Sequence, residues 1–573
     1  MDTLQALTNS FESRFGDPMR ASNSFSYPTC AELDNRSAFP ADIAASLDDW
    51  GLPRYYVPAS FGGELVGFDE PFHIMRLVAR RDLTVAIGHG KTMLGAVSAW
   101  VAGADAQCRA VATIVLQNEV VSLALTEREH GSDVSASSTY ATLMADHYLL
   151  NGEKYLINNA TRCTLVTVFA RTATAHGGRD FSLFLVDKTA LPMSSFSVLP
   201  KSLTHGIKGA DISGIRFNNA PVAADAIIGG VGRGLEVVLK GFQITRTLCA
   251  ALCCGAGDHA LRLAARFAAQ RQLYGKTLGS LPIIRRTLGQ ACADVLVADV
   301  VGLFASRAIN VLPGQMSVIS AAVKAFVPPR IEFAVESLVD VLGARAYVDA
   351  EGEYVSFAKL LRDCRLVSMF DGNTVVNLQA LMLQLGQIGR GRGQAEPRDA
   401  SLRALFDLGP PCPPLVRGQL ALSSRGQDTI VSSVLDAKGK LSEMTGVAED
   451  VAKQLQSLTG FLIERLIEVD LFFRDNVVPA RKVGKPYFDM AESYCKVFAA
   501  SCCIQAFLYN RGRVHATLRD GAWLAECLTH LLDPARASYE TLLQNLDVAV
   551  RENVLISIFP FSLARELAEE VHP

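Results

Sequence analysis

The hydrophobic pattern of the chain changes twice, and this restricts the folds that it can adopt. Between residue 120 and about residue 225, short runs of β-branched and aromatic residues alternate with Asn-Gly and Gly-Gly pairs. That pattern predicts the strands of an antiparallel β-domain. On both sides of it, apolar residues recur at three- and four-residue steps, which is typical of packed helices. We therefore expect an α+β protein that is mostly α.

Long helical patterns follow the strands. They cover residues 235–269, 283–311 and 317–342, and their apolar repeats predict a helical bundle. The glycine-rich stretch 229–234 resembles a phosphate-binding loop, but no parallel strand precedes it in a βαβ unit, so it predicts a turn into the first helix. In the first helical part, His89 and Gly90 are expected in a loop.

A stretch rich in Gly, Pro and charge separates the bundle from more helical sequence at the C-terminal end, and it predicts a linker. The expected organisation is an N-terminal helical domain, a middle β-domain, a C-terminal helical bundle, a linker and an extra helical domain, over residues 1–118, 119–228, 229–390, 391–427 and 428–573.

Composition excludes several classes of partner. The 573 residues carry 55 basic and 58 acidic side chains, so the net charge of −3 predicts binding neither to nucleic acid nor to an anionic membrane. No apolar run reaches the roughly 18 residues of a spanning helix, and no secretory signal is visible, so we expect no integral membrane segment. The 13 cysteines form no CxxC pair, which predicts reduced thiols, no metal site and a cytoplasmic location.

Two segments that are far apart in the sequence contain the candidate functional residues. The first, residues 123–133, begins as an apolar strand and breaks into a loop around Gly131, whose hydroxyls and backbone N–H groups suit phosphate and polar ring edges. The second, residues 361–374, ends a helical pattern on the carboxylate of Asp371 beside Gly372. Together they resemble the acyl-CoA dehydrogenase family, in which a Leu-Thr-Glu…Gly-Ser-Asp segment lies against FAD and an acidic residue is the catalytic base. The resemblance covers roughly residues 45 to 390.

The resemblance implies the cofactor, the reaction and the residues that carry them. The reaction is α,β-dehydrogenation of an acyl thioester, either acyl-CoA or an acyl group on a carrier protein, and the electrons pass to a flavoprotein or to O₂. Asp371 is implied as the catalytic base. The residues implied in FAD binding are Thr126, Ser132, Asn158, Arg271 and Gly343. Those implied in substrate binding are Ser132, Arg246, Asp371 and Gly372.

In the family, the arginine that corresponds to Arg271 reaches the FAD of a neighbouring subunit, so the resemblance also implies a homodimer. A guanidinium can bind a pyrophosphate through two hydrogen bonds, which fits that role.

Several positions depart from the family pattern. Asp371 stands where Glu is usual, so the side chain is shorter by one methylene. Thr245, at the position of an alternative base, cannot serve as one. Leu156 and Asn158 replace a Trp and a Thr beside the flavin. These changes keep two other functions open: an oxidase or oxygenase on the same scaffold, and a catalytically silent scaffold protein.

Overall fold

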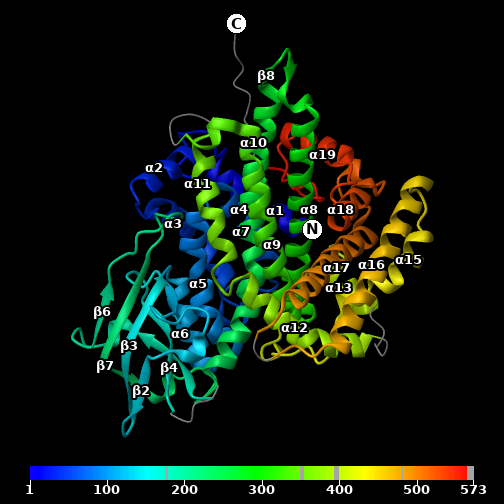
Figure 1. Cartoon of the computed structure of the whole chain (residues 1–573). Coiled ribbons are helices and arrows are strands. Elements are labelled where there is room, and N and C mark those ends of the chain that lie inside the picture. The colour runs from blue at the N-terminus through cyan, green and yellow to red at the C-terminus, as the bar shows by residue number, and fades with distance from the viewer. Residues whose placement is uncertain (174–178, 349–353, 393–398, 480–481, 564–573) are drawn as a thin grey trace.

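A β-domain lies against one side of a larger helical body in the computed structural model (Figure 1). The structure describes residues 1–173, 179–348, 354–392, 399–479 and 482–563. Along the chain, helices precede the strands and helices follow them, so the predicted α+β, mostly α fold class is confirmed.

Six helices come before the sheet. They are α1 (Asp2–Phe15), α2 (Tyr27–Asn35), α3 (Ala41–Trp50), α4 (Asp69–Arg81), α5 (Leu83–Ala102) and α6 (Asp105–Leu116). Asp82 begins α5, because its side chain accepts a hydrogen bond from Val85 N at 2.8 Å.

The loop expected at His89 and Gly90 is wrong, since both residues lie inside α5. The glycines of this helix allow close packing. A Cβ at Gly95 would lie 2.3 Å from Val121 O, so this glycine lets α5 approach the first strand. Burial of the helix offsets the low helix propensity of glycine.

The middle domain is one seven-stranded sheet in the order β1-β4-β2-β3-β7-β6, with β5 paired to β4. Its strands are β1 (Val121–Ala124), β2 (Tyr140–Leu143), β3 (His147–Asn158), β4 (Leu165–Arg171), β5 (Phe181–Asp187), β6 (Phe196–Leu199) and β7 (Ile212–Ala223). The expectation of purely antiparallel pairing is wrong at β4, which runs parallel to β1 and to the start of β2. The β2–β3 hairpin separates β1 from β4 along the chain, so β4 returns beside β1 in the same direction.

The helical bundle follows the sheet. Its elements are α7 (Gly234–Gln270), the hairpin β8 (Gln272–Leu273) and β9 (Lys276–Thr277), α8 (Pro282–Val311), α9 (Met316–Ser337), α10 (Val339–Leu342), α11 (Val355–Cys364) and α12 (Thr374–Gly391). The predicted turn over residues 229–234 is confirmed, because α7 begins at Gly234.

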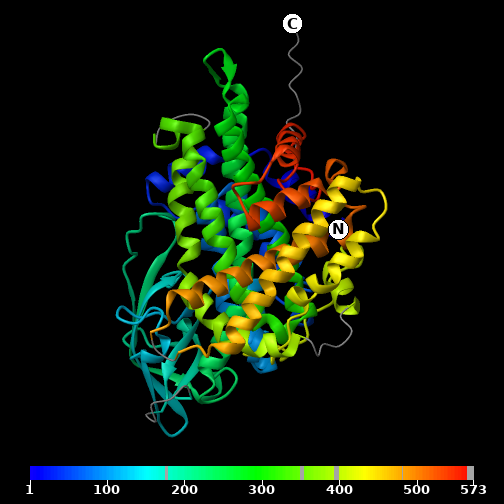
Figure 2. The ribbon, with the colours of Figure 1, turned by 45° about the vertical axis from the view of Figure 1, so that its right-hand side comes forward.

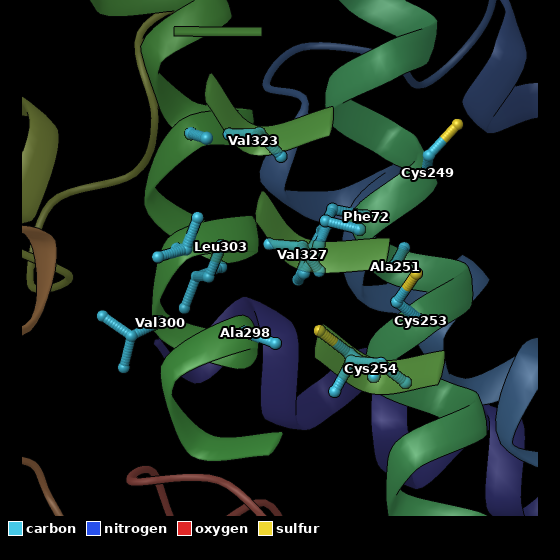
Figure 3. Packing of buried hydrophobic residues seen from close by; sticks show 14 of the residues in the cluster. Phe72, Cys249, Ala251, Cys253, Cys254, Ala298, Val300, Leu303, Val323 and Val327 are labelled. Atoms are coloured by element: carbon cyan, nitrogen blue, oxygen red, sulfur yellow. The ribbon is translucent and has the colours of Figure 1, made fainter. Parts of the chain in front are cut away.

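Small residues bring the bundle helices close together (Figure 3). Cys253 and Cys254 of α7 face Val327 of α9, and Phe72 of α4 reaches between the helices. Gly302 of α8 leaves space for that ring, since a Cβ there would lie 2.6 Å from Phe72 Cε2. Helices α7 and α8 each contain a stretch long and apolar enough to cross a membrane, and 78% and 94% of those stretches are buried inside the protein.

The C-terminal helices share the core of the bundle. They are α13 (Asp399–Phe406), α14 (Thr429–Ser432), α15 (Val434–Ser442), α16 (Glu449–Asp475), α17 (Lys485–Asn510), α18 (Ala522–Leu532) and α19 (Glu540–Arg551). Figure 2 shows α16 and α17 crossing the face of the bundle. One continuous set of buried side chains runs from Leu4 to Leu563, so these helices are packed as part of the helical body.

The stretch predicted as a linker contains α13. Leu402, Leu405 and Phe406 are buried there against the bundle, so that part of the linker prediction is wrong. The apolar spacing of these three residues outweighs the Gly- and Pro-rich sequence around them. Residues 393–398 of the same stretch lie outside the described residues.

Buried charges join α4 and the C-terminal segment of the chain to α7. Asp258 of α7 accepts hydrogen bonds from Arg80 Nε at 3.1 Å, Arg262 Nε at 3.2 Å and the backbone N of Ile556 at 2.7 Å. Burial would raise the pKa of Asp258, but Arg262, Arg80 and these hydrogen bonds lower it to about 2. The stabilisation is therefore complete above the ordinary Asp pKa and is lost as the pH falls toward 2.

Replacing Asp258 with Asn should lower the free energy of unfolding by about 3–5 kcal/mol, because two buried guanidinium groups lose their acid partner. Chemical denaturation monitored by circular dichroism measures the change. Asp547→Asn, which removes the exposed partner of Arg551 on α19, is the control and should change the stability little. Equal losses in the two variants would show that the Asp258 cluster does not hold the helices together.

Candidate active site

Asp371 lies in a tight turn between two helices. A 3₁₀ turn over Arg365–Ser368 follows α11, and α12 begins at Thr374, where the Asn373 side chain accepts a hydrogen bond from Val376 N at 2.9 Å. Between them, Asp371 has a φ of 55° and Gly372 a φ of 89°. Non-glycine residues rarely adopt such a left-handed conformation, and they do so mainly at turns and functional sites.

Two side chains hold this turn in place. Arg246 of α7 donates from Nε to the carbonyl oxygen of Asp371 at 2.7 Å, and Asn377 donates from Nδ2 to that of Gly372 at 2.8 Å. Burial lowers the pKa of Arg246. A Cβ at position 372 would lie 2.9 Å from Arg246 Nη2, so both the positive φ and the space available require glycine there. Arg246 and Gly372, predicted at the substrate, therefore shape the turn that presents Asp371.

The Asp371 side chain forms part of the wall of an apolar pocket that opens to solvent. Helices α4, α5 and α7 supply most of the wall, and apolar side chains dominate it. The lining residues are Tyr56, Pro71, Met75, Ala86, Ile87, Gly90, Lys91, Met93, Leu94, Thr245, Leu248, Cys249, Leu252, Phe370 and Asp371. Such a pocket suits an acyl chain whose reacting carbon lies beside the carboxylate.

Three other polar groups reach the pocket. Lys91 Nζ lies 3.2 Å from Asp371 Oδ1, and both side chains are more than 90% buried, with exposed fractions of 9% and 7%. Cys249 Sγ lies 4.0 Å from Asp371 Oδ2. Burial, with the neighbouring Asp371 carboxylate, raises the pKa of Cys249 to about 11, so this thiol stays protonated near neutral pH. Thr245 Oγ1 is buried and has no hydrogen-bond partner within the described part of the chain.

Sequence reasoning missed Lys91. The signal was present, because Lys91 is the one Lys, Arg, Asp or Glu between Leu83 and Ala102, and it falls within an apolar helical pattern. A lone cation in a helix of that kind is either buried with a partner or directed at a site.

A second group of predicted residues lies on the sheet. The backbone N of Tyr155 donates to Thr126 O at 2.9 Å, and Ser122 Oγ donates to Asn158 O at 2.8 Å. These two hydrogen bonds connect the β1 segment with β3. Thr126, just after β1, and Asn158, at the end of β3, therefore lie on neighbouring parts of the sheet. Ser132 lies in the exposed loop that follows Thr126.

Glu127 holds that loop to the sheet. Its carboxylate accepts hydrogen bonds from Lys154 Nζ at 2.8 Å, the backbone N of Ser138 at 2.7 Å and the backbone N of Thr139 at 2.9 Å. Burial opposes ionisation, but Lys154 and the surrounding hydroxyl groups hold the pKa of Glu127 well below its usual range. Burial lowers the pKa of Lys154 to about 8, although Glu127 acts against this shift. The ion pair fixes the loop that carries Ser132.

The sheet residues fit the flavin that the resemblance implies. Asn158 Oδ1 is buried and has no hydrogen-bond partner among the residues that the structure describes. A buried amide oxygen without a partner is unfavourable, so a ligand that donates a hydrogen bond there would satisfy it. Thr126 is partly buried and Ser132 is exposed, so both hydroxyls remain open to a ligand.

Arg271 and Gly343 lie away from the pocket and the sheet. Arg271 ends α7 at the β8–β9 hairpin and Gly343 follows α10, and both are exposed. In Figure 1 the β8 and α10 labels lie at the end of the helical body opposite the sheet. Within one chain, the structure therefore does not bring these two residues to the other predicted cofactor-binding residues.

Comparison with known proteins matches two parts of the chain to one family. Residues 122–220 match the acyl-CoA dehydrogenase middle domain, and residues 232–385 match the acyl-CoA dehydrogenase C-terminal domain. The probable acyl-CoA dehydrogenase FadE25 of Mycobacterium tuberculosis is 26% identical over 61% of this chain and 88% of its own. The human mitochondrial short-chain specific acyl-CoA dehydrogenase is also 26% identical, over 61% of this chain and 84% of its own.

Solved structures of other proteins have a similar fold. The glutaryl-coenzyme A dehydrogenase complex with glutaryl-CoA has a TM-score of 0.60 at 22% identity, over 67% of this chain and 94% of that one. An acyl-CoA dehydrogenase of Bacillus anthracis complexed with FAD has a TM-score of 0.64 at 17% identity, over 96% of this chain and 90% of that one. The second likeness includes the C-terminal helices. Residues 122–220 and 232–385 are therefore the middle and C-terminal domains of the acyl-CoA dehydrogenase family, whose members are oxidoreductases.

Proposed function

We propose that the protein catalyses the FAD-dependent α,β-dehydrogenation of an acyl thioester, carried either by CoA or by a carrier protein. The observation that carries this proposal is the single carboxylate, Asp371, in the wall of a pocket lined mainly by apolar side chains. The relatives named as acyl-CoA dehydrogenases support the reaction class.

Asp371 acts as the base that removes the α-proton of the acyl group. Its carboxylate is buried at the pocket wall, and the fixed turn holds it there through Arg246. The backbone N–H of Asp371 donates a hydrogen bond to the thioester oxygen, which stabilises the negative charge that develops as the proton leaves. The apolar walls contributed by α4, α5 and α7 exclude water from the reacting carbons.

FAD, when bound, supplies the acceptor for the β-hydride. Thr126, Ser132 and Asn158 hold it at the sheet, and Asn158 contributes the buried oxygen that otherwise lacks a partner. An electron-transferring flavoprotein or O₂ would take up the electrons from the bound cofactor.

Arg271 and Gly343 serve the cofactor of a second copy in a homodimer. The positions of β8 and α10, which Arg271 and Gly343 adjoin, at the end of the helical body opposite the sheet support this arrangement (Figure 1). Tyr274 and Tyr347, close to them in sequence, are each 89% exposed, as expected for side chains that a second copy covers.

A second candidate function is an oxidase on the same scaffold. Leu156, at a bulge of β3 with a φ of 55°, is 45% exposed, so the edge beside Asn158 is open. An open edge favours access of O₂ to a reduced flavin.

Replacing Asp371 with Asn should leave the bound flavin intact and slow its anaerobic bleaching by acyl thioesters by about 10²–10⁴-fold, the usual contribution of a general base. Stopped-flow absorbance with a panel of straight, branched and carboxylated acyl-CoA substrates measures the rate. Asp436→Asn, on the exposed face of α15, is the control. Normal bleaching by Asp371→Asn would overturn the assignment of the base, and a wild-type flavin that no thioester bleaches would overturn the proposed reaction.

Replacing Arg271 with Met should weaken FAD binding by about tenfold or more while the dimer persists, because a charge-assisted hydrogen bond to the cofactor is lost. The flavin-to-protein ratio after dialysis and light scattering give the two readouts. Arg536→Met, which alters an arginine whose side chain is 85% exposed, is the matched control. A monomer that keeps its full flavin content would contradict the role of a second copy.

The two candidate functions differ in how the reduced flavin reacts with O₂. A dehydrogenase should reoxidise slowly in air-saturated buffer, and an oxidase rapidly. If the open edge admits O₂, Leu156→Trp should slow the reaction, whereas Leu143→Trp, at another exposed strand position, should not. Slow reoxidation of the wild type would exclude the oxidase.

A further inference from the structure

The ammonium of Lys91 is buried beside the proposed base, and the proposed reaction gives it no role. It lies 3.2 Å from Asp371 Oδ1, in the wall of the acyl pocket. It also lies 3.9 Å from the ring centre of Phe370, where a cation is attracted to the face of an aromatic ring. A charged lysine in an apolar pocket is unfavourable unless it is paired, so its position here requires an explanation.

Four titratable groups surround Asp371, from three helices. Arg246 and Cys249 belong to α7, Lys324 to α9 and Lys91 to α5. Arg246 donates to the carbonyl oxygen of Asp371, and Lys324 donates to the carbonyl oxygen of Val367. Cys249 is neutral near physiological pH, because burial and Asp371 raise its pKa to about 11. Among the described residues, the cation that contacts the carboxylate itself is therefore Lys91.

The conformation of the turn and the contact with Lys91 together limit where the Asp371 carboxylate can lie. Asp371 has one methylene fewer than the usual Glu, and its backbone is held in a left-handed conformation. A short carboxylate of this kind has few positions available, and a partner on α5, across the pocket wall from the turn, restricts them further.

We propose that Lys91 is a positioning residue for the proposed dehydrogenation. Its ammonium directs the Asp371 carboxylate along the pocket wall, and it remains as a counter-charge during the reaction. This inference rests on the proposed function, since it assigns a role beside the same base.

The charges balance through the step. Initially the Asp371 carboxylate and the Lys91 ammonium sum to zero. The α-carbon–hydrogen bond breaks, and the proton forms an O–H bond on Asp371, which becomes neutral. The electron pair of that bond stays on the acyl group as an enolate and then forms the α,β double bond, as the β-carbon–hydrogen bond breaks and its own electron pair leaves as a hydride. Bound FAD would accept this hydride, so the acyl group loses two electrons in total. Lys91 keeps its positive charge throughout, so after the proton transfer its ammonium balances the negative charge that has moved to the enolate.

The pH dependence of anaerobic flavin bleaching tests this role. In Lys91→Met the acid-side fall of the rate should move to higher pH by about one unit or more, because a cation at this distance favours the ionised carboxylate. Lys91→Arg should restore most of the wild-type profile. Lys324→Met is the matched comparison: it removes a buried lysine that surrounds Asp371 but donates to a backbone carbonyl, so it should move the acid-side fall less than Lys91→Met does.

Two outcomes of that experiment would overturn the proposal. One is a Lys91→Met profile that superimposes on the wild type or moves no further than that of Lys324→Met. The other is a loss of bleaching by carboxylated acyl thioesters alone, with normal bleaching by uncharged ones, because Lys91 would then contact the substrate and not position the base.

Thermal unfolding without substrate gives a second readout that does not depend on turnover. Lys91→Met and Asp371→Asn should each lower the Tm, and the double variant should lose less than the sum of the two, because each single change leaves one buried group without its partner. Additive losses would show that the two side chains are not coupled. If no thioester bleaches the wild type, the proposed function fails, while this cycle still decides whether Lys91 and Asp371 act as a pair.

Discussion

Buried ion pairs hold the helices that form the pocket. Asp258 of α7 joins Arg80 of α4 to the backbone of Ile556, and Asp299 of α8 joins Arg76 of α4 to the Ser557 hydroxyl. Because a charge buried without its partner is strongly unfavourable, these contacts fix α4, α7 and α8 relative to one another and bind the last described segment of the chain to them. Helices α4 and α7 also line the pocket beside Asp371, so the C-terminal segment helps to fix two of its walls.

The site combines two rigid parts. On the sheet, the Glu127–Lys154 pair fixes the loop after β1, and Asn158 presents a buried oxygen. On the helical side, Arg246 and Asn377 hold the turn that presents Asp371, and Lys91 holds its carboxylate. The close approach of α5 to β1, which Gly95 allows, brings the two parts together. Charge pairs thus set the geometry on both sides, whereas apolar walls define the space between them.

Local patterns were sufficient for the parts of the fold that depend on periodicity. The long helices α7, α8 and α9 follow from their apolar spacing, and the β-domain follows from its short β-branched runs. The errors arose where a residue's neighbours are distant in sequence. His89 and Gly90 lie in a helix because burial outweighs the low propensity of glycine, and β4 runs parallel to β1 because of how the β2–β3 hairpin returns the chain. Leu402, Leu405 and Phe406 form a helix against the bundle within a stretch that is otherwise rich in Gly and Pro.

The sequence alone determined the family, the order of helices and strands, and Asp371 as the candidate base, because these depend on local spacing and on motifs contiguous in the chain. Only the tertiary structure decided what surrounds that base. Lys91 lies 280 residues before Asp371 in the chain and Arg246 lies 125 residues before it, and no local pattern indicates that three such distant residues meet. The tertiary structure also separated Arg271 and Gly343 from the sheet residues. The physical reason is the same in each case: contacts between distant segments depend on how helices pack, which the spacing within any one helix does not specify.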